Sequence, residues 1–150
     1  MQTCIKTEKM KIYIGSDHAG FELKSAIKSR FSEGNDFEDF GAFSSESVDY
    51  PDFAHKVAER VSGEDGSFGI LICGTGNGMA ITANKHRGVR AALCWSPEIS
   101  ALARQHNNAN ILVLPARFIS EETAFKTVES FFEAGFDGGR HQKRIEKIDI

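Results

Sequence analysis

The chain has 150 residues, of which 41% are hydrophobic and 26% charged, and its formal net charge is −3. A chain of this length and composition forms one ordinary domain that buries its core without disulfides or metal ions. The slightly acidic charge gives no electrostatic reason to expect nucleic acid or a membrane as a partner, and no run approaches the ~20 apolar residues of a membrane span. Three cysteines, an odd number without C-x-x-C spacing, favour a reduced protein of the cytoplasm.

The first half of the chain predicts two strands and two helices. Residues 11–16 read KIYIGS, a short apolar strand, and residues 21–31 carry apolar side chains at close to helical spacing. Residues 36–41 alternate in polarity as a weaker strand. A helix opens at Pro51 and presents one apolar face as far as Val61.

The second half continues the alternation. Residues 68–73 read FGILIC, a continuous apolar run that is typical of a strand buried on both faces. The remaining elements are, in order, a helix over 78–85, a strand over 89–94, a helix opened by Ser96 and Pro97, a strand over 110–115 and a helix capped by Ser120.

Five alternations of strand and helix predict an α/β fold, with a parallel sheet covered by helices on both faces. We expect residues 1–10 to be a disordered extension and residues 11–150 to form a single domain. The last segment follows Gly138 and Gly139 and carries only a thin apolar stripe. In open parallel sheets, ligands bind beyond the carboxyl ends of the strands, so functional side chains are expected directly after strands.

The loop that follows the strand over 68–73 reads CGTGNG, from Cys73 to Gly78. A glycine-rich turn from a strand into a helix exposes consecutive N–H groups at the positive end of the helix and so binds anions. The spacing is not the G-x-G-x-x-G of dinucleotide-binding domains, and no G-K-[S/T] follows, as a P-loop requires. A smaller anion remains, either a phosphate or an oxyanion that develops during a reaction.

Several side chains near these loops have both a structural and a chemical interpretation. Cys73 is either an ordinary buried thiol or a nucleophile or base that the helix dipole activates. His18 and His106 are either hydrogen-bonded loop residues or catalytic groups. Arg140 and Arg144 are four residues apart, so on a helix they form either a solvated basic face or a phosphate clamp.

Five stretches of the chain carry a resemblance to a known family: GSDHAGFELK (15–24), DYPDFA (49–54), GILICGTGNGMAITANK (69–85), RQHNNANIL (104–112) and FDGGRHQKR (136–144). In this order they resemble the type B ribose-5-phosphate isomerases, a group that also contains galactose-6-phosphate and allose-6-phosphate isomerases. The resemblance extends from about Lys11 to the end of the chain.

The resemblance implies a Rossmann-like three-layer sandwich whose five parallel strands follow the order 2-1-3-4-5, with a C-terminal helical arm. It implies interconversion of ribose 5-phosphate and ribulose 5-phosphate in the pentose phosphate pathway, through an enediolate and without metal or organic cofactor. It also implies a homodimer, or a dimer of dimers, in which each active site is shared between two subunits.

The resemblance also implies roles for individual residues. Cys73 matches the base that moves the proton between C1 and C2, and His106 matches the group that opens the furanose ring. The backbone of Gly74, Thr75, Gly76, Asn77 and Gly78 matches the anion hole for the enediolate. Contacts to the sugar are implied for Asp17, His18, Tyr50 and Asn107, and contacts to the phosphate for Arg117, Arg140 and Arg144, the last two from the partner subunit.

Two alternatives to this function remain at the level of sequence. The first is an isomerase of a six-carbon sugar phosphate, such as allose 6-phosphate or galactose 6-phosphate. The second is a non-catalytic, flavodoxin-like module that binds a nucleotide or a flavin, although the absent G-x-G-x-x-G motif disfavours it.

Overall fold

The computed structural model describes residues 9–150, so the disorder expected for residues 1–8 lies outside the described part. Met10, which was expected in the disordered extension, instead begins the first strand and pairs with Asn35. The strands are β1 (Met10–Ser16), β2 (Asn35–Asp39), β3 (Phe68–Cys73), β4 (Ala91–Leu93) and β5 (Ile111–Pro115). The helices are α1 (Phe21–Arg30), α2 (Tyr50–Gly63), α3 (Asn77–Ala83), α4 (Pro97–Asn107), α5 (Glu121–Glu133) and α6 (Arg140–Ile145). The predicted alternation of strands and helices is confirmed, including the C-terminal helix.

All five strands are parallel, and their order across the sheet is β2-β1-β3-β5-β4. The predicted Rossmann-like α/β class is therefore confirmed, but the predicted order 2-1-3-4-5 is wrong. The reason lies in the composition of the last two strands. All five residues of β5 are apolar and buried, which suits the interior of the sheet, whereas β4 has only three half-buried residues and forms the edge.

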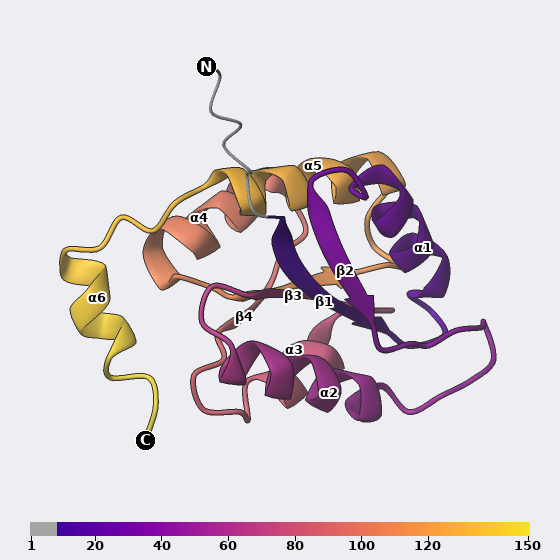
Figure 1. The fold of residues 1–150 in the computed structure, drawn as a ribbon, viewed down its shortest axis with the longest axis horizontal. Coiled ribbons are helices and arrows are strands. Elements are labelled where there is room, and N and C mark those ends of the chain that lie inside the picture. Colours follow the sequence, from indigo (N-terminus) through magenta and orange to yellow (C-terminus); the bar gives the residue numbers. More distant parts are fainter. Residues whose placement is uncertain (1–8) are drawn as a thin grey trace, which may run out of the picture.

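Helices cover both faces of the sheet, with α1, α4 and α5 on one face and α2 and α3 on the other (Figure 1). The alternating side chains of each central strand feed two separate cores. In β3, for example, Ile70 and Ile72 join the first core, while Leu71 and Cys73 join the second. The expectation that this strand is buried on both faces is confirmed.

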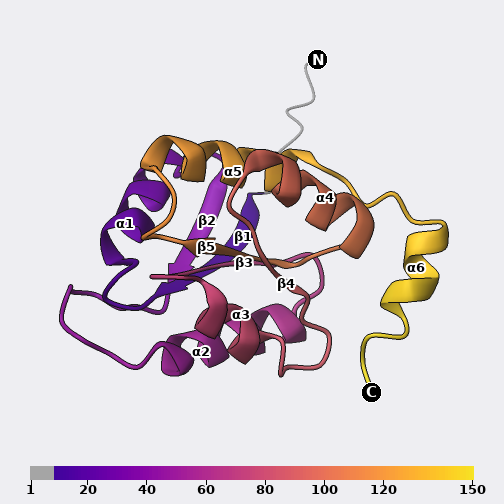
Figure 2. The same ribbon diagram turned by 180° about the vertical axis from the view of Figure 1, so that it is seen from behind.

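The expected helix starts are also confirmed. The Ser96 hydroxyl accepts a hydrogen bond from the Ile99 N–H at 3.4 Å, and the Ser120 hydroxyl accepts one from the Thr123 N–H at 3.1 Å. The last helix, α6, stands apart from the three layers at one end of the molecule (Figures 1 and 2). None of the residues of α6 is buried, so this helix does not contribute to either core.

A buried ion pair fixes the loop that follows β2. The ammonium group of Lys24, which is 1% exposed, donates hydrogen bonds to Asp39 at 2.8 Å and to the carbonyl of Ala42. Lys28 approaches the other carboxylate oxygen of Asp39 at 3.0 Å. Burial by itself would raise the pKa of Asp39, but hydrogen bonds from Lys24, the Gly41 N–H and Lys28 outweigh it and leave the pKa below its ordinary value.

Replacing Asp39 with asparagine should lower the free energy of unfolding at neutral pH by about 3–5 kcal/mol, because Lys24 keeps its buried charge and loses the opposite charge. Urea unfolding measures this change. The matched control is Glu129→Gln, which removes an exposed ion pair with Arg30 (3.5 Å) and should cost about 0–1 kcal/mol. Equal costs for the two variants would contradict this role of Asp39.

The same substitution should change the acid sensitivity of the fold. Because the pKa of Asp39 is lower in the folded than in the unfolded chain, its contribution is complete above the unfolded pKa and is lost as the pH falls through the folded pKa. The stability difference between the wild type and Asp39→Asn should therefore shrink as the solution is acidified below about pH 4. A constant difference down to strongly acidic pH would refute the ionised state assigned to Asp39.

Candidate functional site

A cavity of about 350 Å³ opens at the carboxyl ends of the strands. It is lined by residues that follow three different strands or begin a neighbouring helix: Asp17, His18, Ala19, Tyr50, Cys73, Gly74, Thr75, Gly78 and Arg117. Eight of these nine residues were expected at the site from the sequence, and Ala19 was not. The parallel sheet brings them together because the ends of β1, β3 and β5 meet at one edge.

The thiol of Cys73 lies at the last position of β3 and is 4% exposed. Its Sγ accepts a hydrogen bond from the Gly76 N–H at 3.2 Å, which fixes the sulfur beside the glycine loop. The N–H groups of Thr75, Gly78 and Met79 have no acceptor among the residues that the structure describes. The loop therefore presents unpaired donors beside the sulfur, the arrangement that an oxyanion requires.

Packing explains two of the glycines in this loop. Gly76 has φ of 79°, a left-handed conformation, and a Cβ there would lie 2.3 Å from Leu93 Cδ1. A Cβ on Gly78 would lie 2.5 Å from the ring of Tyr50. From the sequence, these glycines were expected to expose N–H groups to an anion. The structure adds that only glycine allows Tyr50 and Leu93 to pack against the loop.

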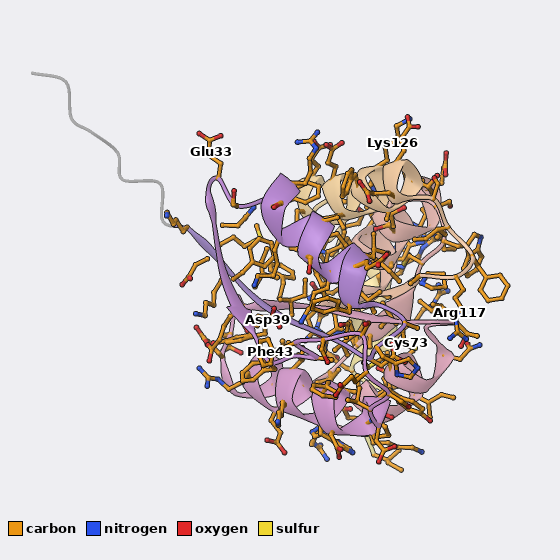
Figure 3. The ribbon with its side chains drawn as sticks, turned by 90° about the vertical axis from the view of Figure 1, so that its right-hand side faces the viewer. Glu33, Asp39, Phe43, Cys73, Arg117 and Lys126 are labelled. Atoms are coloured by element: carbon orange, nitrogen blue, oxygen red, sulfur yellow. The ribbon has the colours of Figure 1, made fainter. Side chains whose placement is uncertain are left out.

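Arg117 is held over the glycine loop by two backbone hydrogen bonds. The Ala116 N–H donates to the Cys73 carbonyl at 2.9 Å, and the Arg117 N–H donates to the Gly74 carbonyl at 3.0 Å. Figure 3 shows the side chains of Cys73 and Arg117 on the same side of the molecule. A guanidinium group in this position supplies the positive charge that a phosphate needs.

The turn after β1 positions Asp17 and His18. One carboxylate oxygen of Asp17 accepts a hydrogen bond from the Gly20 N–H at 3.1 Å, which fixes the start of α1. The Val48 N–H donates to Nδ1 of His18 at 3.3 Å. Nδ1 is then the acceptor, so Nε2 carries the proton and is available as a donor. Sequence reasoning missed Val48, because nothing in its residue type indicates a backbone donor.

A second group of expected site residues lies elsewhere. His106, Asn107 and Arg144 line another cavity, of about 290 Å³, together with His141 and two isoleucines of the C-terminal segment. His106 and Asn107 end α4 and precede β5, so they lie at the amino edge of the sheet. The length of β5, roughly 16 Å, separates them from the edge that carries Cys73.

Three further expected residues line neither cavity. Arg140 is the exposed first residue of α6, and Gly76 and Asn77 belong to the glycine loop but contribute to its backbone rather than to the cavity wall.

A larger cavity of about 620 Å³ lies between the connection from α3 to β4 and the C-terminal residues. It contains neither thiol, so the chemistry points to the smaller cavity at the carboxyl edge.

His141 is a residue of the second cavity that sequence reasoning did not assign to a site. Its ring stacks on that of His106, with centroids 4.4 Å apart and planes inclined by 12°. Desolvation, followed by the charges of His106 and Arg140, holds the pKa of His141 below its ordinary value. The available signal was its position between Arg140 and Arg144, in a segment that already carried candidate residues.

Cys94 differs from Cys73 in its surroundings. It is fully buried in the first core, and burial raises the pKa of its thiol to about 12. It therefore stays protonated and unreactive at physiological pH.

Within residues 9–150, no helix is long and apolar enough to cross a membrane.

Comparison with known proteins points to the same family as the sequence motifs. The family model described as Ribose/Galactose Isomerase matches residues 12–148. The chain is 47% identical over 140 residues to the probable ribose-5-phosphate isomerase B of Mycoplasma genitalium, covering 91% of this chain and 92% of that protein. It is 45% identical over 139 residues to the ribose-5-phosphate isomerase B of Escherichia coli, covering 92% and 93% of the two chains.

Solved structures show that the likeness extends to the fold. The ribose 5-phosphate isomerase of Thermotoga maritima superposes with a TM-score of 0.90 at 56% identity, covering 93% of this chain and 97% of that one. The Mycoplasma genitalium enzyme, crystallised with bound ribulose-5-phosphate, superposes with a TM-score of 0.90 at 46% identity, covering 93% of each chain. Because the family model matches residues 12–148 and these relatives share 45–56% of their residues with it, the chain belongs to the Ribose/Galactose Isomerase family.

Proposed function

We propose that this chain interconverts ribose 5-phosphate and ribulose 5-phosphate. The observation that carries the proposal is the thiol of Cys73 beside the unpaired N–H groups of the glycine loop, in a cavity that Arg117 also lines. The relatives named ribose-5-phosphate isomerase B, one of them with ribulose-5-phosphate bound, support a pentose phosphate rather than a six-carbon sugar phosphate. The same relatives are enzymes, which disfavours a non-catalytic flavin- or nucleotide-binding module.

The reaction moves one proton between neighbouring carbons. In the open-chain aldose, the Cys73 thiolate takes the proton from C2, the electron pair forms the C1–C2 double bond, and the carbonyl oxygen gains a negative charge. The N–H groups of Thr75 and Gly78 hold that charge, an effect worth about 3–4 kcal/mol per donor in comparable sites. The thiol then returns its proton to C1, and the hydroxyl proton on O2 moves to O1, which yields the ketose.

The hydroxyl groups and the ring oxygen of the sugar need hydrogen-bond donors and acid–base groups of their own. Nε2 of His18 is the donor at the cavity wall, since Nδ1 is occupied by the Val48 N–H. Opening of the furanose ring needs a further acid–base group, the role that we give to His106. In one chain His106 lies at the opposite edge of the sheet, so a second chain has to supply it.

We therefore also propose a homodimer, or a dimer of dimers, with shared sites. The edge strand β4 is unpaired on its outer side, between α3 and α4 (Figure 2). Around it lie three exposed apolar side chains: Ile81 (62% exposed) on α3, Trp95 (56%) after β4 and Leu102 (42%) on α4. A two-fold axis near this edge would place the amino edge of one chain, with His106, Asn107 and Arg144, against the carboxyl edge of the other.

The proposed chemistry of the Cys73 thiol bears on the cellular compartment in which the protein acts. A mechanism that uses the free thiol of Cys73 suits a reducing compartment, which supports the cytoplasm as the place of action. The proton transfer described above needs neither a metal ion nor an organic cofactor.

Cys73→Ala should lower kcat for ribose 5-phosphate by about 10²–10⁴-fold with little change in KM, because it removes the base and leaves the phosphate contacts. The matched control is Cys94→Ala, which removes a thiol of the same size that stays protonated in the core. Coupled spectrophotometric assays of both purified variants measure the effect. A Cys73→Ala enzyme with the wild-type rate would disprove the assignment of the base.

Mixing two inactive variants should restore activity if the sites are shared. Cys73→Ala and Arg144→Ala homodimers are each expected to be impaired. After unfolding and refolding together in equal amounts, half of the dimers are mixed and one of their two sites is intact, so roughly a quarter of the wild-type activity should return. Light scattering measures the oligomeric state in parallel. No recovery, together with confirmed mixed dimers, would indicate a site built within one chain.

A substrate panel distinguishes the pentose from the hexose alternatives. We expect kcat/KM to be highest for ribose 5-phosphate and much lower for allose 6-phosphate and galactose 6-phosphate, in the presence of a chelator. A preference for either six-carbon substrate would overturn the proposed specificity. Loss of activity on adding the chelator would contradict catalysis without a metal ion.

A further inference from the structure

Three side chains that can bind a metal ion converge at the amino edge of the sheet. Nitrogen atoms of His106 and His141 and a carboxylate oxygen of Asp137 all lie within 4.8 Å of one another. Within residues 9–150, this is the only such group of three or more. The three residues come from two segments: His106 from the end of α4, and Asp137 and His141 from the stretch that leads into α6 and its first turn.

The backbone holds these two segments together. The Asp137 N–H donates to the carbonyl of Gln105 at 3.0 Å, which ties the chain after α5 to the last turn of α4. Gly138 and Gly139 then take positive φ values of 67° and 57°, and this turn brings His141 back over His106. The convergence of the three side chains therefore depends on several contacts rather than on one exposed rotamer.

The donor set selects the kind of ion. Two imidazoles and one carboxylate suit zinc and similar transition metals, whereas magnesium and calcium prefer oxygen ligands alone. Zinc holds nitrogen ligands about 2.1 Å away, so ligand atoms around one ion lie roughly 3–4 Å apart. The observed spread of 4.8 Å or less is close to this. Because the two rings stack with planes inclined by only 12°, binding requires the imidazoles to turn until their lone pairs meet at the ion.

The surrounding charges set a limit on affinity. Arg140 and Arg144 belong to the same short helix as His141 and repel a cation, while Asp137 attracts it. The group is open to solvent, where water and salt screen these interactions. A solvent-supplied fourth ligand is also available there, as in open zinc sites.

We propose that His106, Asp137 and His141 form a binding site for Zn²⁺, and that the bound ion inhibits the isomerase. The inhibition rests on the function proposed above: an ion bound to His106 occupies the nitrogen that would act on the furanose ring. It also fills the side of the second cavity that Arg144 lines. The site itself does not depend on that function.

Zinc binding to the purified full-length protein, measured by competition with a chromogenic chelator in phosphate-free buffer, tests the site. Asp137→Asn and His141→Gln should each weaken binding by more than about tenfold. The matched control is His86→Gln, which breaks an exposed histidine pair (His55 Nδ1 to His86 Nε2, 2.7 Å) and should leave the affinity unchanged. Equal affinity in all variants, or no binding by the wild type, would overturn the proposal.

Cobalt substitution identifies the ligands without any activity assay. The Co²⁺ spectrum should lack a thiolate charge-transfer band, because the three ligands are nitrogen and oxygen; such a band would place the ion on a cysteine and refute the site. Zn²⁺ should also slow isomerisation by the wild type and by His86→Gln, but not by Asp137→Asn, and a chelator should reverse the effect. Zinc binding that leaves the rate unchanged would refute the inhibition. Because binding is measured without substrate, it decides the site even if ribose 5-phosphate proves not to be the substrate.

Discussion

The direction of the strands in a parallel sheet constrains everything else in this protein. Residues that follow strands meet at one edge, and residues that precede strands meet at the other. Cys73, the glycine loop and Arg117 lie at the carboxyl edge, whereas His106, His141 and Arg144 lie at the amino edge. A small sugar phosphate cannot touch both edges of one chain. The two-fold dimer that we propose would resolve this, because its axis would place unlike edges opposite each other.

The interactions around the carboxyl edge form a connected series. The buried Lys24 holds Asp39 and the carbonyl of Ala42, and so fixes the beginning of the loop that follows β2. The end of that loop supplies the Val48 N–H, which sets the tautomer of His18. Backbone hydrogen bonds tie Arg117 to the glycine loop. His18 and Arg117 are therefore held in place by backbone contacts from neighbouring loops.

Sequence patterns predicted the elements and the loops that follow β1 and β3 because both depend on local signals. The apolar run over 68–73 and the serine caps of α4 and α5 are examples. The strand order could not be read in this way, since it depends on the competition between β4 and β5 for an interior position. Nor could the sequence show that a backbone N–H of Val48 sets a histidine, or that His141 stacks on His106, because both contacts join segments distant in the chain.

We propose that the thiol and the loop amides of one chain act on a substrate whose other contacts come from a second chain. The most direct measurement is a crystal structure of the protein with a phosphorylated hydroxamate that mimics the enediolate. The account predicts an inhibitor oxygen 2.7–3.1 Å from loop N–H groups of Thr75 or Gly78, with the Cys73 sulfur beside the carbon analogue and Arg144 of a second chain near the inhibitor. An inhibitor bound away from that sulfur, or enclosed by one chain alone, would contradict it.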